Sequence, residues 1–175
     1  MGTAFGVFII VERGETLFLI DHHAAHERIL YDQFIASQGQ RQTLLIPYVI
    51  ETANRDEDDY LESLKTALFD AGFEMTNCGS GRWEAATAPV LWNGGEEDLR
   101  EALLQKRLNP EEVLARCAAA CACKQAVKEG DVLGAETACF IAEQTLAMEN
   151  PRCPHGRPLY AALPRDDLYR AVKRT

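Results

Sequence analysis

The stretch FGVFIIVERGETLFLID, residues 5–21, sets the architecture of the first part of the chain. It contains two runs rich in β-branched and aromatic residues, 5–11 and 16–20, and the polar segment 12–15 separates them. Runs of this kind around a glycine-containing turn are typical of a β-hairpin. Apolar residues then recur at helical spacing as far as Phe34, and Gly39 follows. We therefore expect a hairpin that leads into a helix with one buried face.

The remainder of the chain mixes strand and helix patterns without regular alternation. The expected strands are 44–50, interrupted by Pro47, then 73–77, 82–88 and 159–163. The expected helices are one that starts at 56–59 and ends at Gly72, then 96–108, 110–128 with Asn109 as its N-cap and Pro110 in its first turn, 136–148 and 166–173. This order favours an α+β fold. The acidic section 52–115 is interpreted as an inserted lobe, because residues 1–51 and 116–175 carry the chemically reactive side chains.

Charge and composition limit the classes of function. The chain has 27 acidic and 18 basic residues, a formal net charge of −9, with acids concentrated at 56–59 and 96–98. Lys and Arg contacts to phosphate supply most non-specific affinity for DNA, so this chain should bind DNA weakly by itself. No apolar run approaches the ~20 residues of a membrane span. Without an export signal, the six cysteines are expected to be reduced or metal-bound rather than disulfide-bonded.

The residues capable of metal chemistry gather in two short segments. All four histidines lie in residues 21–28 and 153–158. In a helix that starts near position 22, His23 and Glu27 stand four residues apart on one face, and Asp21 lies at the strand end just before them. Cys153 and His155 are one residue apart in a loop rich in Pro and Gly. Imidazole, thiolate and carboxylate together favour Zn²⁺, or Mn²⁺ where oxygen ligands dominate.

These residues also have structural interpretations. Asp21 suits the N-cap of the helix, and Cys153 and His155 fit ordinary loop positions. We interpret His22 and His26 as solvated surface. The cysteines interpreted as small buried thiols are Cys78, Cys117, Cys121 and Cys139. Cys123 differs because Lys124 and Lys128 follow it, and nearby cations favour a thiolate, which is the ligand form.

Three segments resemble the motifs of the MutL family of DNA mismatch-repair proteins. In residues 19–32, LIDHHAAHERILYD, the family's endonuclease motif is matched at Asp21, His23, Ala24 and Glu27. His22 stands where the family usually has Gln, and Asp32 stands where it usually has a second Glu. Residues 122–128, ACKQAVK, resemble the second motif, and residues 153–158, CPHGRP, match the third. The motifs occur in family order, and the resemblance extends over nearly the whole chain.

The resemblance implies a metal-dependent endonuclease and dimerisation domain that nicks duplex DNA. The implied catalytic residues are Asp21 and Glu27. The implied metal ligands, for Zn²⁺ and Mn²⁺, are Asp21, His23, Glu27, Cys123, Cys153 and His155. The resemblance also implies a two-lobed α+β domain, with a dimerisation lobe formed by 1–51 and 116–175 and a smaller regulatory lobe formed by 52–115.

The resemblance further implies a homodimer in a cytoplasmic, nucleoid-associated bacterial protein with no membrane contact. Residues 42–47, QTLLIP, resemble the segment that binds the replication sliding clamp. The implied contact residues are Gln42, Leu45, Ile46 and Pro47. A buried strand ending in Pro is the alternative for this segment. A mismatch-recognition protein is expected to act through the full-length chain, which in this family carries an ATPase domain.

Two other functions compete with nicking. The first is a non-catalytic dimerisation module with a structural zinc site, which the altered positions His22 and Asp32 keep open. The second is a cysteine hydrolase that uses Cys153, although it leaves Asp21, His23 and Glu27 unexplained. A nicking assay with Mn²⁺ separates the first from the endonuclease, and thiol alkylation without metal dependence identifies the second.

Overall fold

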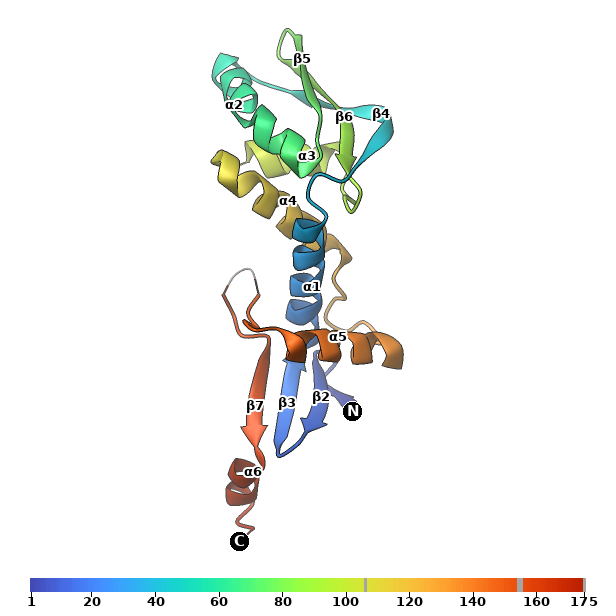
Figure 1. Ribbon diagram of the computed structural model, residues 1–175, viewed down its shortest axis with the longest axis vertical. Coiled ribbons are helices and arrows are strands. Elements are labelled where there is room, and N and C mark those ends of the chain that lie inside the picture. The colour runs from blue at the N-terminus through green and yellow to red at the C-terminus, as the bar shows by residue number, and fades with distance from the viewer. Residues whose placement is uncertain (106, 154–155, 175) are drawn as a thin grey trace. The chain divides into compact units, whose positions relative to one another are not determined.

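The computed structural model describes residues 1–105, 107–153 and 156–174, and it divides into two compact units (Figure 1). Unit 1 comprises Met1–Ile29 and Ala126–Thr175, and unit 2 comprises Leu30–Gln125. Helix α1, His22–Ala36, starts in unit 1 and ends in unit 2. Helices and antiparallel sheets occur in both units, which confirms the α+β class. Within the described residues, no helix is long and apolar enough to cross a membrane.

Unit 1 contains a four-stranded antiparallel sheet in the order β1-β2-β3-β7. Its strands are β1 Gly2–Ala4, β2 Phe8–Arg13, β3 Thr16–Asp21 and β7 Tyr160–Pro164. The predicted hairpin is confirmed, and Arg13 pairs with Thr16 across a two-residue turn. The predicted first strand starts too early, because Phe5 and Gly6 have positive φ and turn the chain from β1 into β2.

The core of unit 1 lies on one face of this sheet. Ile9 and Ile20 are cross-strand partners and are fully buried. Helix α5, Ala135–Ala147, and the first turns of α1 pack on them. The packed helix residues are Ala25, Ile29, Ala138, Ile141 and Ala142. The last helix, α6 Arg165–Ala171, is held to the hairpin turn by an ion pair of 2.7 Å between Arg165 and Glu15.

The opposite face of the same sheet is apolar and only partly buried. Side chains alternate along a strand, so cross-strand partners share a face. Ile10 pairs with Leu19, and Leu17 pairs with Leu163. All four are partly exposed, and none belongs to a core cluster of the described residues. Unit 1 therefore presents apolar residues on both sides of its sheet, and only one side is covered.

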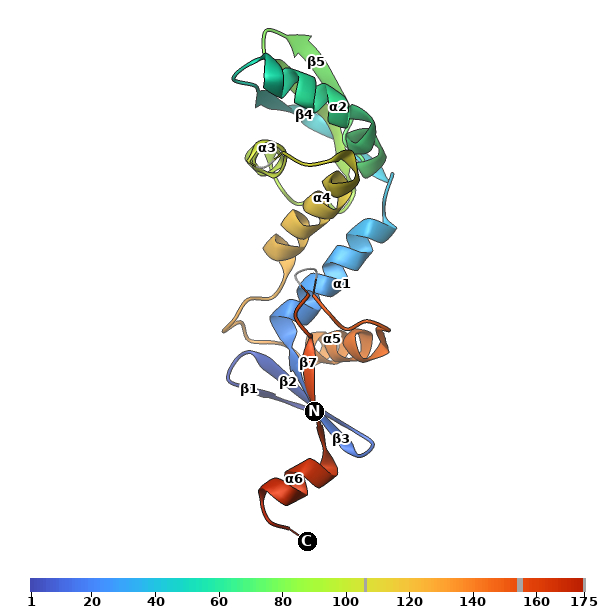
Figure 2. The same ribbon diagram turned by 90° about the vertical axis from the view of Figure 1, so that its left-hand side faces the viewer.

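Unit 2 contains a three-stranded antiparallel sheet in the order β4-β6-β5. Its strands are β4 Arg41–Glu51, β5 Met75–Gly79 and β6 Arg82–Pro89. Its helices are α2 Arg55–Ala71, α3 Glu96–Leu104 and α4 Pro110–Gln125. Figure 2 shows α2 lying beside the sheet. Trp83 of β6 is fully buried against the apolar stripe of α2, Leu61, Leu64 and Leu68.

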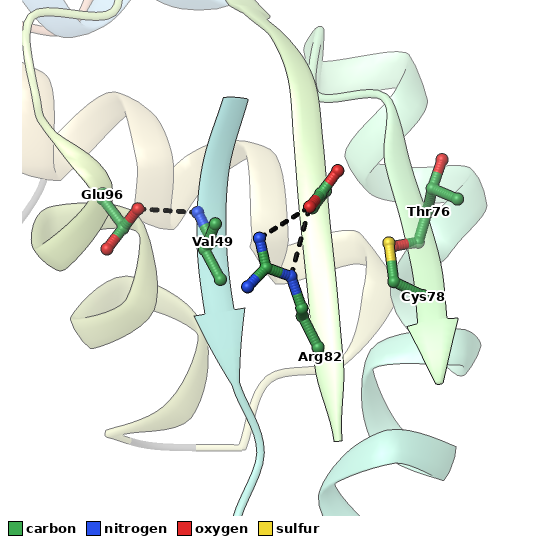
Figure 3. A network of polar contacts seen from close by, with 6 residues as sticks. Val49, Thr76, Cys78, Arg82 and Glu96 are labelled. Atoms are coloured by element: carbon green, nitrogen blue, oxygen red, sulfur yellow. Dashed lines mark hydrogen bonds and ion pairs between the residues drawn. The ribbon is translucent and has the colours of Figure 1, made fainter. Parts of the chain in front are cut away.

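The other face of the unit 2 sheet is polar (Figure 3). Arg82 donates to Glu84 on the same strand at 3.2 and 2.8 Å. Strand β4 is an edge strand, and its Val49 N–H donates to the carboxylate of Glu96 at 2.7 Å. A charged side chain that occupies an edge N–H protects the edge from pairing with another strand. Unit 2 is thus closed by helices on one face and by charged side chains on the other.

Local capping explains where the helices of unit 2 begin and end. Asn54 caps α2 by accepting a hydrogen bond from the Glu57 N–H at 3.1 Å. The predicted stop at Gly72 is confirmed, because this residue has φ 110° and a side chain there would meet Pro89 at 3.0 Å. The predicted helix 96–108 is too long, since α3 ends at Leu104 and the Leu108 N–H donates to the Tyr60 hydroxyl instead.

Strand β4 carries a large bulge at the segment that resembles a clamp-binding motif. Thr43 pairs with Thr87 and Tyr48 pairs with Ala85, so residues 44–47 stand opposite a single residue of β6. Leu44 packs on the core, whereas Leu45 and Ile46 are 99% and 77% exposed. The predicted strand 44–50 is part of the longer strand β4, and the irregularity expected at Pro47 is a bulge and not a break. The alternative of a buried strand fails for Leu45 and Ile46.

The predicted inserted segment 52–115 lies within unit 2. Unit 2, Leu30–Gln125, is larger than this predicted segment. It includes β4, because β4 pairs with β6 in the same sheet. The division of the chain into a dimerisation lobe and a regulatory lobe stays a prediction.

Candidate metal centre

Asp21 is the last residue of β3 and directly precedes the first turn of α1. Its backbone N–H donates to the Leu159 carbonyl at 2.9 Å, which fixes it between β3 and the segment before β7. Its Oδ1 accepts a hydrogen bond from the Ala24 N–H at 3.0 Å, so the expected helix-capping role is confirmed. A carboxylate has a second oxygen, and capping through Oδ1 is compatible with metal ligation through Oδ2.

His23 is oriented by the backbone of a distant loop. Its Nδ1 lies 2.7 Å from the carbonyl oxygen of Val127. A carbonyl can only accept, so Nδ1 carries a proton, and in the neutral imidazole Nε2 then keeps its lone pair. Metal-binding histidines are commonly held in this way, with one ring nitrogen donating to a carbonyl or carboxylate while the other faces the ion. The local geometry therefore prepares His23 to ligate through Nε2.

Glu27 follows His23 by four residues on α1 and is only 3% exposed. A carboxylate buried to this degree is costly unless a cation or hydrogen-bond donors compensate its charge. Together with Asp21 it places two carboxylate residues at the start of the helix that carries His23. Hard oxygen ligands and imidazole are a combination that suits Mn²⁺ and Zn²⁺.

Cys153 belongs to the same unit and lies against the start of α1. It is 3% exposed and packs with Ala24 and Leu159. Arg28 of α1 donates to the backbone carbonyl of Arg152, which ties this segment to the helix. The Cys153 N–H donates to the Arg157 carbonyl at 2.9 Å. His155, predicted as a ligand, lies outside the described residues.

Two histidines that the sequence interpretation assigned to the solvated surface are not there. His22 is 2% exposed, and its Nε2 donates to the Gly6 carbonyl at 2.9 Å. Its Nδ1 is buried and has no hydrogen-bond partner in the described part of the chain. His26 is partly buried, and its Nδ1 accepts from the Val127 N–H at 3.1 Å. Burial, and then the neighbouring His22 and His23, lower the pKa of His26. The surface interpretation was wrong for both.

The cysteines divide differently from the prediction. Cys117 and Cys121 are buried in α4 as expected, and burial raises the pKa of Cys117 to about 12, so it is a thiol. Cys78 and Cys139 are exposed, which contradicts their interpretation as buried. Cys123, the ligand predicted from unit 2, is exposed near the end of α4. The adjacent Lys124 forms a 2.5 Å ion pair with Asp98 of α3.

Four predicted ligands belong to unit 1: Asp21 directly precedes α1, His23 and Glu27 lie on its first turns, and Cys153 packs against Ala24 of the same helix. Among residues 1–105, 107–153 and 156–174, no group of three or more His, Cys, Asp or Glu side chains is arranged to hold a metal ion. The convergence of all six predicted ligands, which includes His155, stays a prediction. The sequence interpretation missed Val127, and no signal could have found it, because any residue can contribute backbone groups.

Comparison with known proteins places the chain in a family. A family model described as the MutL C terminal dimerisation domain matches residues 1–133. The DNA mismatch repair protein MutL of Treponema pallidum is 39% identical over 175 residues, which cover 100% of this chain and 28% of the relative. The MutL of Thermoanaerobacter pseudethanolicus is 33% identical over 183 residues, covering 99% and 30%. That of Halothermothrix orenii is 32% identical over 186 residues, covering 99% and 29%.

The chain spans less than a third of the length of these relatives. The family model, by contrast, covers most of it. On this basis the chain belongs to the family of MutL C-terminal dimerisation domains of DNA mismatch-repair proteins.

Proposed function

We propose that this domain is a metal-dependent endonuclease that nicks duplex DNA. The observation that carries the proposal is the hydrogen bond from His23 Nδ1 to Val127, which leaves Nε2 available to an ion. The buried Glu27 and the helix cap Asp21 supply carboxylates at the start of the same helix. The proposed ligand set is completed by Cys123, Cys153 and His155, and its mixed oxygen, nitrogen and sulfur donors suit Zn²⁺ and Mn²⁺.

The chemistry proposed is hydrolysis of a phosphodiester. The proposed ligands would hold a divalent ion, which would supply a Lewis acid to polarise phosphate and to lower the pKa of a water molecule. Asp21 and Glu27 act as the catalytic pair by holding and orienting that water through their carboxylate oxygens. His23 would contribute its Nε2, which the hydrogen bond from Nδ1 to the Val127 carbonyl orients.

The test is nicking of supercoiled plasmid with Mn²⁺, measured together with the zinc content of the purified protein. Asp21→Asn is the decisive variant. Asn caps helices as well as Asp does, so the fold should remain while one negative charge is lost. We expect nicking to disappear. Asp59→Asn is the matched control, because it removes the same charge from an exposed ion pair with Arg55 in unit 2. Full nicking by Asp21→Asn would refute the catalytic proposal.

A non-catalytic dimerisation module with structural zinc is the alternative. It predicts bound zinc without nicking in the parent protein, and loss of zinc in Cys153→Ser. The third possibility, a hydrolase with Cys153 as nucleophile, is disfavoured by burial. A catalytic thiol needs access to its substrate, whereas Cys153 is enclosed by Ala24 and Leu159.

For self-association, we propose a homodimer that uses the uncovered face of the unit 1 sheet. The family is described by dimerisation, and this face carries the partly exposed apolar residues Ile10, Leu17, Leu19 and Leu163. Large uncovered apolar faces rimmed by polar residues are typical of association surfaces. The face is formed by the β2–β3 hairpin and β7, so the N-terminal and C-terminal segments of the chain would share the interface.

The bulge of β4 is proposed to bind a sliding clamp. Leu45 and Ile46 project from unit 2, and Gln42 is held near them by its donation to the Pro89 carbonyl at 3.3 Å. Two exposed aliphatic side chains next to an amide suit an apolar pocket on a partner. Gln42→Ala with Leu45→Ala should abolish clamp-stimulated nicking. Val132→Ala, which shortens an equally exposed side chain in unit 1, should leave the stimulation unchanged.

Delivery of DNA by a partner follows from the charge. A net charge of −9 opposes the approach of phosphate, so the isolated domain should bind duplex DNA weakly at physiological salt. A mismatch-recognition protein acting through the full-length chain, and the sliding clamp, would supply the missing affinity. Tight salt-resistant binding of DNA by the isolated domain would contradict this part of the proposal.

A further inference from the structure

The backbone on both sides of Val127 is held by one turn of α1. The Val127 carbonyl accepts from His23 Nδ1 at 2.7 Å, and the Val127 N–H donates to His26 Nδ1 at 3.1 Å. His23 and His26 are three residues apart, so they project from neighbouring positions on the helix. A single residue is thereby held through both of its backbone polar groups by two imidazoles.

These two bonds require opposite tautomers. The carbonyl of Val127 can only accept, so His23 carries its proton on Nδ1. The N–H of Val127 can only donate, so Nδ1 of His26 is unprotonated and its proton lies on Nε2. His23 is then left with a free lone pair on Nε2, and His26 is left with none. The hydrogen bonds therefore separate a histidine that can ligate from one that cannot.

A second set of contacts fixes the loop that carries Val127. His22 Nε2 and the Gly130 N–H both donate to the Gly6 carbonyl, at 2.9 and 3.2 Å. The Lys128 N–H donates to the Asp131 side chain at 2.7 Å. Val127 itself packs against the core of unit 1. All three histidines of residues 22–26 thus hold backbone groups of segments that are distant in sequence, and together they immobilise residues 127–130 against the helix.

We propose that His26 is a positioning residue of the metal centre, which holds Val127 so that His23 presents Nε2 to the ion. The inference rests on the proposed metal site and adds a residue to it. Without the bond from Val127 to His26, the carbonyl of Val127 loses one of its constraints, and His23 becomes free to adopt the other tautomer. Mutation of a group that orients a metal-binding histidine typically lowers metal affinity by about 10–100-fold.

The experiment compares His26→Leu with His26→Asn. Leu removes the acceptor, whereas the side-chain oxygen of Asn accepts from the Val127 N–H at nearly the position of Nδ1. Zinc affinity is measured by competition with a chromophoric chelator. The tautomer of His23 is measured in the metal-free protein by nitrogen-15 NMR of the imidazoles, at about pH 8, where an ordinary histidine is neutral.

We expect His26→Leu to bind zinc about 10–100-fold more weakly and to show a mixture of His23 tautomers. His26→Asn should recover most of the affinity and the Nδ1–H tautomer. If His26→Leu keeps both properties of the parent, or if Asn is no better than Leu, the proposal is overturned. A loss of thermal stability without a change of tautomer would reduce His26 to a structural residue, which also overturns it.

The parent protein provides a test that does not depend on a variant. Its metal-free spectrum should show His23 protonated on Nδ1 and His26 protonated on Nε2, and two identical tautomers would refute the arrangement. If the parent binds no zinc, the proposed metal site itself fails. The tautomers separate the two failures, because they are read without metal.

Discussion

Units 1 and 2 each contain a small sheet with one face covered by helices, and they differ in the residues on the other face. Unit 2 covers one face of β4-β6-β5 with α2, α3 and α4 and lines the other with charged side chains such as Arg82 and Glu84. Unit 1 covers one face of its sheet with α1 and α5 and leaves the other apolar. The difference supports the proposed dimer, in which the uncovered face of the unit 1 sheet contacts a second copy of the chain.

The two units also differ in net charge. Unit 2 has sixteen acidic and nine basic residues, whereas unit 1 has eleven and nine, so their net charges are −7 and −2. Of the six proposed metal ligands, only Cys123 belongs to unit 2. Most of the repulsion that opposes DNA therefore originates in the unit that carries the proposed clamp segment, and the unit with most of the proposed chemistry is nearly neutral.

The largest expected effect is on the core of unit 2. Leu64 is fully buried, and Leu64→Ala should reduce the free energy of unfolding by about 2–5 kcal/mol, because a cavity remains. Leu19→Ala, on the open face of unit 1, is the matched control and should cost the monomer much less. Urea unfolding followed by far-ultraviolet circular dichroism measures both variants, because the helices and strands of both units contribute to this signal. Equal losses would contradict the contrast between a closed and an open sheet.

The same contrast shows what the sequence could predict. The hairpin of residues 8–21, helix α2 with Gly72, and the start of α4 at Pro110 were predictable because turn and capping residues act locally. The strand β1 and the turn at Phe5 and Gly6 were not, because an apolar run gives no sign of the point at which it reverses. The apolar residues on the uncovered face of the unit 1 sheet are of the same types as those on its buried face. The sequence therefore does not show which face is covered.

The candidate site was predictable to a similar extent. Helical spacing placed His23 and Glu27 on one helix, and the motifs pointed to Cys153. The burial of His22 and His26 was missed because their partners are the backbone of Gly6 and Val127, which are distant in sequence. The exposure of Cys78 and Cys139 was missed because a thiol fits either environment.

The second expected effect is on assembly. Leu19 lies in the middle of the open face, between Ile10 and Ala161, and Leu19→Glu should weaken the dimer by more than about tenfold by burying a charge at the interface. Leu45→Glu adds the same charge to an exposed position in unit 2 and should leave the dimer intact. Sedimentation at micromolar concentration distinguishes them. If the Leu19→Glu variant remains dimeric, the interface lies on another surface and not on this face of the sheet.

A smaller effect, confined to acid, is expected in unit 2. Asp58 accepts hydrogen bonds from the Thr52 hydroxyl and the Trp83 indole, at 2.7 and 2.8 Å, and these lower its pKa below the ordinary value of 3.8. Because the folded pKa is the lower one, the stabilisation is present above 3.8 and is lost as pH falls from there through the folded pKa. The difference in unfolding free energy between the parent and Asp58→Asn should therefore shrink in acid. If this difference in unfolding free energy does not change with pH, the charge of Asp58 does not account for the stabilisation.

The smallest effect is expected at His22, in unit 1. His22 donates through Nε2 to Gly6, and its Nδ1 is buried without a partner in the described residues. His22→Gln offers an amide donor at a similar distance from the backbone, and the family resemblance places Gln at this position. It should keep the bond to Gly6 and change the unfolding free energy by less than about 0.5 kcal/mol. His22→Leu removes the donor and should cost about 1 kcal/mol or more. Thermal unfolding measures the stability of the two variants. Equal losses of unfolding free energy would mean that the shape of the imidazole, and not its hydrogen bond to Gly6, holds the turn against α1.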